Sequence, residues 1–215
     1  FSSILKEDYR GVLDEDGVGF LDRIQQSSER MQGLIDDLLS LSRVTTQAKS
    51  FQSVELNEVA GEVINDLDDL ITRSKGRVEI GDLPRIKADR TQIYHLIQNL
   101  IGNGLKYQQK DQAPRISVEN VPNENGLIEI RVKDNGIGFD EKYLDRIFKP
   151  FQRLHGRKEY QGTGIGLAIC NKIVRRHEGE MTATSAPGQG ATFIVKLPCD
   201  LYQKQKSTTS HISEV

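Results

Sequence analysis

Hydrophobic residues recur at helical spacing in the first part of the chain. Phe1 to Tyr9 has this spacing, Gly11 interrupts it, and a longer amphipathic helix is predicted to run to about Ser42. The stretch Leu13–Asp16 places acidic residues where a helix N-terminus favours them. The apolar positions of the second helix are Phe20, Ile24, Met31, Leu34, Ile35, Leu38 and Leu41. The pattern predicts a helical hairpin over residues 1–46.

A hairpin this short buries too little apolar surface to be stable by itself. We therefore expect a second copy of the chain to pair with it, forming a dimeric four-helix bundle. The alternative is that the hairpin packs on the rest of its own chain.

A polar, aperiodic linker at residues 45–53 marks the boundary of a second domain, residues 51–198. Strands and helices alternate there, which predicts an α+β fold whose second domain is an open α/β sandwich. Helices are expected over residues 54–74, 89–107, 141–148 and 164–176, and strands over 78–80, 85–88, 115–121, 128–134, 180–185 and 192–197. Residues 199–215 form a polar tail without pattern.

Composition narrows the class of protein. The 215 residues carry 29 basic and 31 acidic side chains, a net charge of −2 without a basic block, so nucleic acid and anionic lipid are not expected partners. No membrane segment and no signal-peptide pattern is apparent, which favours a cytoplasmic location. Two isolated cysteines, Cys170 and Cys199, are expected to be free thiols.

The helix predicted after Asp89 has the most informative polar pattern. Asn99, Asn103 and Lys106 stand four and three residues apart and so share one face. Asp89 and Gln92 have the spacing of a capping box. The apolar positions of this helix are Ile93, Leu96, Ile97, Leu100, Ile101 and Leu105. Burial of those residues would fix where the polar groups point; the alternative is a buried helix whose asparagines only satisfy nearby backbone groups.

Three glycine clusters follow. Asp134 closes an apolar strand, where its carboxylate can accept a hydrogen bond from an exocyclic amine while Gly136 and Gly138 let backbone approach a flat ring, which describes an adenine pocket. The run Gly162–Gly166 opens into a helix, so its N–H groups would face an anion such as a triphosphate. The third cluster, Gly188–Gly190, alone indicates only a hairpin or bulge.

In this order, the motifs resemble the catalytic core of sensor histidine kinases, within the ATPase superfamily that includes gyrase and Hsp90. The likeness covers about residues 1–198. The motifs that carry it are Asn99–Tyr107 (the N box), Asp134–Gly138, Gly162–Leu167 and Gly188–Phe193 (the glycine boxes) and Ile147–Phe151 (the F box). The stretches Phe151–Gly156 and Leu13–Asp16 are most similar to the phytochrome-linked branch.

The resemblance implies ATP and Mg²⁺ as cofactors and assigns roles to single residues. Asn103 would bind Mg²⁺ through its amide oxygen, Asn99 would support the water shell of the metal, and Lys106 would meet a phosphate. Residues 152–161 would form a lid over the triphosphate. The other residues implied in nucleotide binding are Tyr107, Asp134, Gly136, Gly138, Gly162, Thr163, Gly164, Gly166, Leu167 and Thr192.

The acceptor of this family is a histidine on the first bundle helix, followed directly by an acid. None of the four histidines fits: His95 lies on the asparagine helix, His155 in the lid and His211 in the tail. His177 is followed by Glu178, but it lies after the glycine loop, where relatives carry a structural histidine followed by glycine. We expect the acceptor to precede Phe1.

The sequence leaves three candidate functions for the chain. The first is a sensor histidine kinase core that forms a homodimer, transfers the γ-phosphate of ATP to a histidine for relay to a response regulator receiver domain, and follows an upstream sensor domain. The second is a degenerate nucleotide-binding dimerisation module without kinase activity. The third is a free-standing ATPase, which Asn99 disfavours because gyrase-like relatives have a water-activating glutamate at that position and an amide cannot take a proton.

Overall fold

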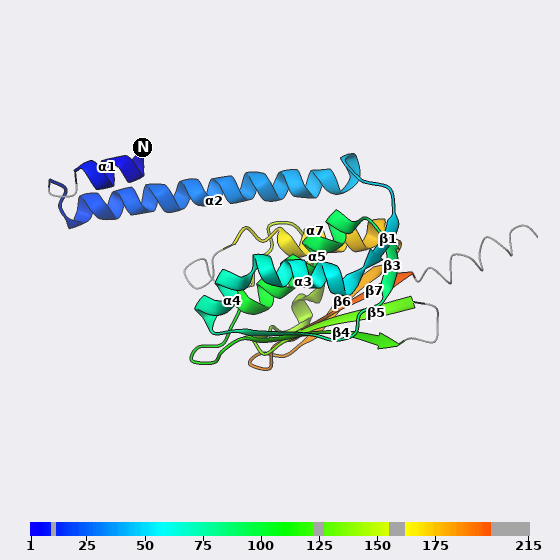
Figure 1. Ribbon diagram of the computed structural model, residues 1–215. Helices are drawn as coiled ribbons and strands as arrows, with labels where there is room; N and C mark the ends of the chain where they lie inside the picture. Colours follow the sequence, from blue (N-terminus) through cyan, green and yellow to red (C-terminus); the bar gives the residue numbers. More distant parts are fainter. Residues whose placement is uncertain (10–11, 123–126, 155–161, 199–215) are drawn as a thin grey trace, which may run out of the picture.

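The computed structural model describes residues 1–9, 12–122, 127–154 and 162–198, arranged as a helical hairpin and an α/β domain (Figure 1). The predicted break at Gly11, most of the predicted lid and the tail lie outside these residues, as do His155, His211 and Cys199. In the part of the chain that is described, no helix combines the length and the hydrophobicity needed to cross a membrane.

The hairpin consists of α1 (Ser2–Asp8) and the much longer α2 (Glu15–Thr46), which lie side by side (Figure 1). Asp14 caps α2 by accepting a hydrogen bond from the Gly17 N–H at 2.8 Å. The helix runs past the predicted end at Ser42. Its last turns are held by the α/β domain, because Gln92 Nε2 donates to the Val44 carbonyl at 2.9 Å.

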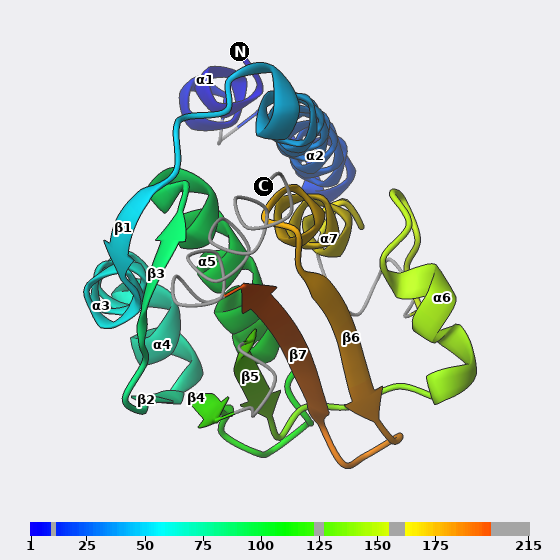
Figure 2. The ribbon, with the colours of Figure 1, turned by 90° about the vertical axis from the view of Figure 1, so that its right-hand side faces the viewer.

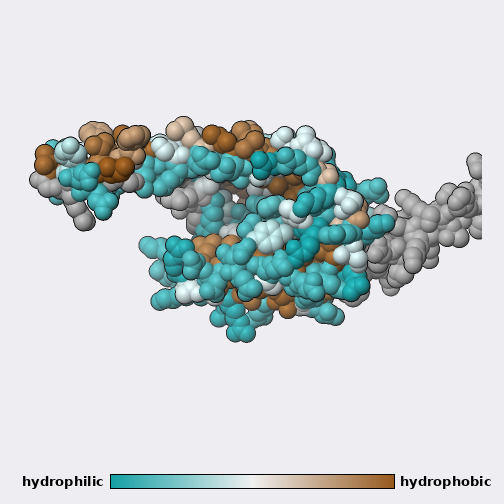
Figure 3. Space-filling model, turned by 45° about the horizontal axis from the view of Figure 1, so that its top comes forward, coloured by the Kyte–Doolittle hydropathy of each residue, from teal (hydrophilic) through white to brown (hydrophobic). Residues whose placement is uncertain are grey.

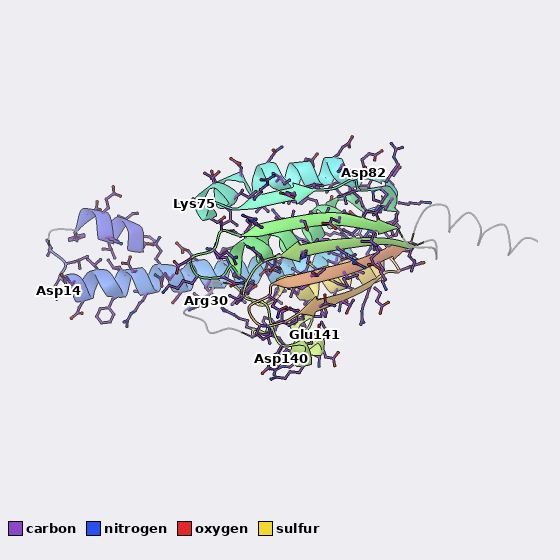
Figure 4. The ribbon with its side chains drawn as sticks, turned by 90° about the horizontal axis from the view of Figure 1, so that it is seen from below. Asp14, Arg30, Lys75, Asp82, Asp140 and Glu141 are labelled. Atoms are coloured by element: carbon purple, nitrogen blue, oxygen red, sulfur yellow. The ribbon has the colours of Figure 1, made fainter. Side chains whose placement is uncertain are left out.

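The strands of the α/β domain form a five-stranded sheet in the order β2-β4-β5-β7-β6, in which only β2 and β4 are parallel. Their bounds are β2 (Arg77–Ile80), β4 (Arg115–Pro122), β5 (Leu127–Asp134), β6 (Glu180–Ser185) and β7 (Ala191–Pro198). Alternate residues of β7 are buried, which places every second side chain on the helical face. Figure 4 looks onto the opposite face, which the helices leave open.

Helices cover one face of this sheet and α2 lies above them (Figure 2). They are α3 (Leu56–Asp66), α4 (Asp68–Ser74), α5 (Arg90–Lys106) and α7 (Gly166–Arg176). A short helical segment, η1 (Glu141–Tyr143) and α6 (Leu144–Ile147), lies beside β6. The hydrophobic core sits between the helices and the sheet, and the predicted α+β architecture is confirmed.

Two predicted boundaries are wrong in detail. The helix expected over residues 54–74 begins only at Leu56 and is two helices with a break at Leu67, and both Leu67 and Ile71 pack against the core. Part of the expected linker is the strand β1 (Gln52–Glu55), which pairs antiparallel with β3 (Arg85–Ala88) in a small separate sheet. Pairing between strands that are distant in sequence leaves no periodic signal in a stretch of four residues.

The apolar stripe predicted for α2 divides between two faces. Leu34 and Leu41 are partly buried against the core of the α/β domain. The remaining positions are exposed, and Figure 3 shows hydrophobic side chains gathered along α1 and α2. They are Phe20, Ile24, Met31, Ile35 and Leu38. The alternative in which the hairpin packs on its own chain therefore describes part of this helix, and pairing with a second copy stays a prediction.

A buried histidine joins the end of α7 to the start of α5. His177 Nε2 accepts a hydrogen bond from the Asp89 N–H at 3.1 Å, while Nδ1 lies 2.8 Å from the Ile173 carbonyl oxygen and so carries the proton. The ring of Phe51 stacks on the imidazole at 4.5 Å between centroids. Burial, and to a lesser degree the charge of Arg176, lowers the pKa of His177 below its ordinary value.

The residue after this histidine adopts a conformation that favours glycine. Glu178 has a φ of 56°, in the left-handed region, and the following Gly179 N–H donates to the Val174 carbonyl at 2.9 Å to close the end of α7. The glycine that relatives carry at this position is thus explained by the turn. A side chain there costs about 1 kcal/mol.

We predict that acid destabilises the protein through His177. The native state holds this side chain neutral, so its contribution to stability is complete above the unfolded pKa of about 6.5 and is lost as pH falls through the lower folded value. His177→Gln should reduce the melting temperature at pH 7.5 and flatten its decline between pH 7.5 and pH 5. His95→Gln, which alters an exposed histidine, should keep the wild-type slope. Parallel pH profiles for wild type and His177→Gln would contradict this account.

Candidate functional site

The polar face of α5 is fixed by the burial of its apolar face. None of its six predicted apolar residues is more than 3% exposed. Asp89 caps the helix by accepting from the Gln92 N–H at 3.3 Å, but the reciprocal half of the predicted capping box is not formed, because the Gln92 side chain instead contacts α2 and Arg176. Asn99, Asn103 and Lys106 consequently line one connected cavity system with the glycine loops.

The first part of that system is a mostly apolar cavity of about 100 Å³ between α5, the sheet and the segment before α7. Asn103, Tyr107 and Asp134 supply polar groups to its wall. The apolar lining residues are Ile137, Phe139, Ile147, Leu154, Leu167, Ala191 and Phe193. A mostly apolar cavity with a few fixed polar groups is the kind of site that holds an aromatic ring system.

Asp134 lies at the end of β5 and uses one oxygen to organise the surrounding backbone. Its Oδ1 accepts from the Gly136 N–H at 2.8 Å and from the Ala191 N–H at 3.2 Å. Burial raises the pKa of this carboxyl above its ordinary value, and the two backbone hydrogen bonds oppose the shift. Among the described residues no bond to Oδ2 is found, so this oxygen can accept a hydrogen bond from a ligand.

The turn after Asp134 is tightly packed. Gly138 has a φ of 61°, and a Cβ there would collide with the carbonyl oxygen of Ala186. Gly136 packs on the Tyr107 carbonyl and does not line the cavity, so its role is to fit the turn against the end of α5. Gln109, which sequence reasoning missed, donates from Nε2 to the carbonyls of Asn135, Gly136 and Gly188 at 2.9–3.1 Å and ties two glycine turns together.

A second cavity of about 250 Å³ continues from the first toward the start of α7. The two share Asn103, Tyr107 and Leu167, so they form one site with an apolar end and a polar end. The glycine loop, residues 162–166, forms one side of the polar end, where the free N–H groups of α7 favour an anion.

Two of the polar groups that could bind an anion or a cation in the polar end, those of Lys106 and Asn103, have no ion-pair or hydrogen-bond partner among the described residues. Lys106 Nζ lies against Gly162 and 4.7 Å from the centroid of the Tyr107 ring, and it has no ion-pair partner in the described chain. The half-buried amide of Asn103 has no hydrogen-bond partner among the described residues either. Asn99 donates from Nδ2 to the His95 carbonyl at 2.9 Å.

Close approach explains one further glycine. A Cβ on Gly166 would lie 2.6 Å from Asn99 Oδ1, so the absence of a side chain brings the start of α7 against the polar face of α5. This contact sets the distance between the asparagines and the glycine loop. Across the ranges that the structure describes, no group of three or more histidine, cysteine or acidic residues could by itself hold a metal ion.

The structure brings most of the predicted site residues together. Those that line the cavity system are Asn99, Asn103, Lys106, Tyr107, Asp134, Gly138, Gly162, Thr163, Gly164, Gly166 and Leu167. Thr192 does not line it: its neighbours Ala191 and Phe193 on β7 do, and strand alternation turns Thr192 to the other face. The predicted contact of Thr192 with a nucleotide stays a prediction that its position outside the cavity lining does not favour.

Comparison with known proteins identifies the family. Residues 88–201 match the model of histidine kinase-, DNA gyrase B- and HSP90-like ATPases, and residues 1–47 match that of the His kinase A (phospho-acceptor) domain. The chain therefore belongs to the histidine kinase-, DNA gyrase B- and HSP90-like ATPase family. The second match and the relatives below confirm the predicted resemblance to the catalytic core of histidine kinases.

Curated relatives include phytochrome-like protein Cph1 of Synechocystis and cyanobacterial phytochrome A of Nostoc, each 39% identical over 198 residues, or 92% of this chain. The chain spans 26% of the length of each. The sensor protein kinase WalK of Staphylococcus aureus is 31% identical over 192 residues, which cover 86% of this chain and 45% of WalK.

Solved structures share the fold. Full-length ShkA, in complex with AMPPNP, has a TM-score of 0.68 at 21% identity, covering 92% of this chain and 41% of ShkA. Histidine kinase ThkA, in complex with the response regulator TrrA, has a TM-score of 0.67 at 20% identity, covering 91% of this chain and 55% of ThkA.

We predict that crowding, more than backbone conformation, makes Gly138 irreplaceable. Gly138 and Gly188 both have left-handed φ values, 61° and 77°, but nothing lies within 4 Å of a Cβ on Gly188. Gly188→Ala should cost only the conformational penalty of about 1–2 kcal/mol. Gly138→Ala should cost clearly more in chemical denaturation, since a backbone carbonyl must move. Equal losses for the two variants would show that the turn relaxes freely.

Proposed function

We propose that this chain is the ATP-binding and dimerisation core of a sensor histidine kinase, which transfers the γ-phosphate of Mg-ATP to a histidine. The observation that carries the proposal is the connected site, whose apolar end contains Asp134 and whose polar end contains Asn103, Lys106 and the glycine loop. The apolar end, the shared middle and the polar end follow one another along the cavity in the same order as the ring, the sugar and the phosphates of a nucleotide.

The apolar end fits adenine. The exocyclic amine of adenine is a donor, and Asp134 offers the carboxylate oxygen that the protein itself leaves unused. Ile137, Leu167 and Phe193 supply apolar walls for the faces of the ring. Tyr107 lines both cavities, so it lies where the sugar would connect the two ends.

The polar end fits a magnesium-bound triphosphate. The unpartnered amide oxygen of Asn103 is a hard ligand of the kind that Mg²⁺ prefers, and Asn99 stands one turn away to hold a water of its shell. When bound, the ion would neutralise charge on the phosphates. Lys106 and the N–H groups of residues 162–166 would fix the phosphate oxygens, so the contribution of the protein is positioning and charge.

Asn99 favours transfer over hydrolysis. It occupies the place of a water-activating glutamate in gyrase-like relatives, and its amide is held as a hydrogen-bond donor to the His95 carbonyl. An amide does not accept a proton from water at neutral pH. Phosphate is therefore passed to a separate nucleophile, and ATP as the donor places the reaction in the cytoplasm.

The acceptor would be a histidine of the bundle, and neither of the two histidines that the structure describes, His95 and His177, fits that role. His177 is buried, neutral and bonded through both nitrogens, so it is not available as a nucleophile. His95 lies on α5, whereas the family carries its acceptor on the first helix of the bundle. A response regulator receiver domain would take the phosphate onward, and the remaining length of the phytochrome relatives leaves room for an upstream sensor domain.

The exposed stripe of α2 supports a homodimer. Ile24, Met31, Ile35 and Leu38 are between 45% and 56% exposed, although they follow one face of a helix. The short α1 covers only the beginning of α2 (Figure 1). A second hairpin related by a two-fold axis would cover this stripe and complete a four-helix bundle, in line with the match to the phospho-acceptor domain.

We predict that Asp134→Asn weakens ATP binding by about 5- to 150-fold, the effect of replacing a charge-assisted hydrogen bond by a neutral one that is about 1–3 kcal/mol weaker. Asparagine keeps an oxygen for the Gly136 and Ala191 N–H groups, so the fold is retained. Calorimetric titration with Mg-ATP measures the change, and Asp145→Asn on the exposed surface of α6 is the matched control. Wild-type affinity for Asp134→Asn would refute the assignment of the adenine end.

We also predict that Leu38→Glu breaks the dimer, because it places a charge on the apolar stripe. Light scattering should report a monomer at concentrations where the wild type is dimeric, and ATP affinity should be unchanged. Arg30→Glu adds the same side chain to α2 outside the stripe and should leave the dimer intact. An unchanged dimer for Leu38→Glu would place the interface elsewhere.

A further inference from the structure

One face of α2 contacts the glycine loop, residues 162–166, which forms one side of the phosphate end of the site. A Cβ on Gly33 would lie 3.8 Å from the Thr163 methyl group, so the loop rests against the helix backbone there. One turn later, the Thr163 hydroxyl donates a hydrogen bond to Asp37 Oδ2. After a further turn, Lys172 Nζ donates to the Leu41 carbonyl at 2.9 Å. The contacts repeat every four residues along a single face.

Asp37 brings a negative charge into the phosphate end. It lines the same cavity as Asn103, Lys106 and the glycine loop, and it is half-buried. In the described chain it has no ion-pair partner. A triphosphate in this cavity would lie close to the carboxylate, and like charges at short distance in a partly buried site repel. The carboxylate also uses the Thr163 hydroxyl, a group of the loop that would face the phosphates.

The contact between α2 and the α/β domain surrounds a cavity. This cavity of about 520 Å³ lies between α2 and the helices α5 and α7, with Asp37, Arg43, Gln47, His95 and Asn99 among its lining residues. Core packing of Val44 and the hydrogen bond from Gln92 Nε2 to its carbonyl hold the end of α2. The contacts of Gly33 and Asp37 with Thr163 are therefore a small part of this interface.

We propose that the Gly33–Asp37 face of α2 is an autoinhibitory latch on the nucleotide site. With the latch closed, Asp37 holds the glycine loop and its charge opposes the phosphates of ATP; the loop must leave α2 before the triphosphate is fully bound. The inference rests on the proposed function, since it regulates the same site. It implies that a movement of α2 that breaks the contact between Asp37 and Thr163 changes the affinity of the site for ATP.

Binding of ATP and of adenosine to the dimeric full chain tests the latch. Asp37→Asn removes the charge but keeps an acceptor for Thr163, and it should bind the Mg-bound non-hydrolysable analogue AMPPNP about three- to tenfold more tightly than wild type. Adenosine has no phosphates, so its affinity should not change. Gly33→Met, which wedges the loop from the helix without altering charge, should also tighten AMPPNP binding and leave adenosine binding unchanged.

Asp36→Asn is the matched control. Asp36 is adjacent and exposed, and it accepts from Gln32 Nε2 at 3.1 Å outside the cavity, so its variant should bind AMPPNP as wild type does. Equal or weaker AMPPNP binding by Asp37→Asn would overturn the latch, as would an equal gain from Asp36→Asn or a gain that extends to adenosine. Failure of wild type and all variants to bind AMPPNP at millimolar concentration would instead overturn the nucleotide site itself.

Discussion

The burial of one face of α5 is the constraint on which the site depends. Six aliphatic side chains of this helix fill the space between the sheet, α3 and α7, and this packing fixes the rotation of the helix about its axis. A slip of one residue would turn each side chain by about 100°. Asn99, Asn103 and Lys106 would then leave the cavity, so the hydrophobic core sets the geometry of the polar groups.

A second helix, α2, has apolar residues in two environments. Leu34 and Leu41 pack on the α/β domain, whereas Ile35 and Leu38 are exposed. In the proposed dimer, α2 would contact the α/β domain and the second hairpin, and could transmit a rotation or shift from one to the other. The contact of Asp37 with the glycine loop places the phosphate end of the site within reach of such a motion.

The sequence predicted the elements whose signal is local. The 3.6-residue period of α5, the alternation in β5 and β7 and the glycine clusters each follow from the residues of one segment, and the structure has them within a few positions. The break at Leu67 and the strand β1 were missed because they depend on contacts with distant segments. The same holds for Gln109, whose role exists only once two glycine turns are folded side by side.

The site residues likewise include some that local sequence predicts and some that depend on contacts between distant segments. Asp134 and Asn103 could be predicted because their chemistry stands out in an apolar surrounding. Sequence alone could not tell that Ala191 and Phe193, and not Thr192, line the cavity, since the side of a strand that faces a cavity depends on how the strand packs in the sheet. Asp37 could not be found from its own helix, where it is one of several acidic residues on a polar surface; only the packing of α2 on the α/β domain brings it to the cavity.

Hydrogen exchange of backbone amides, measured with and without Mg-bound AMPPNP, tests the central claim most directly. If α5 holds the three motifs around one nucleotide, protection should rise together in residues 103–107, 134–139 and 162–167, while the distant strand β2 should exchange at an unchanged rate. Protection confined to one of these segments, or absent from all three at saturating ligand, would contradict a single nucleotide site organised by α5.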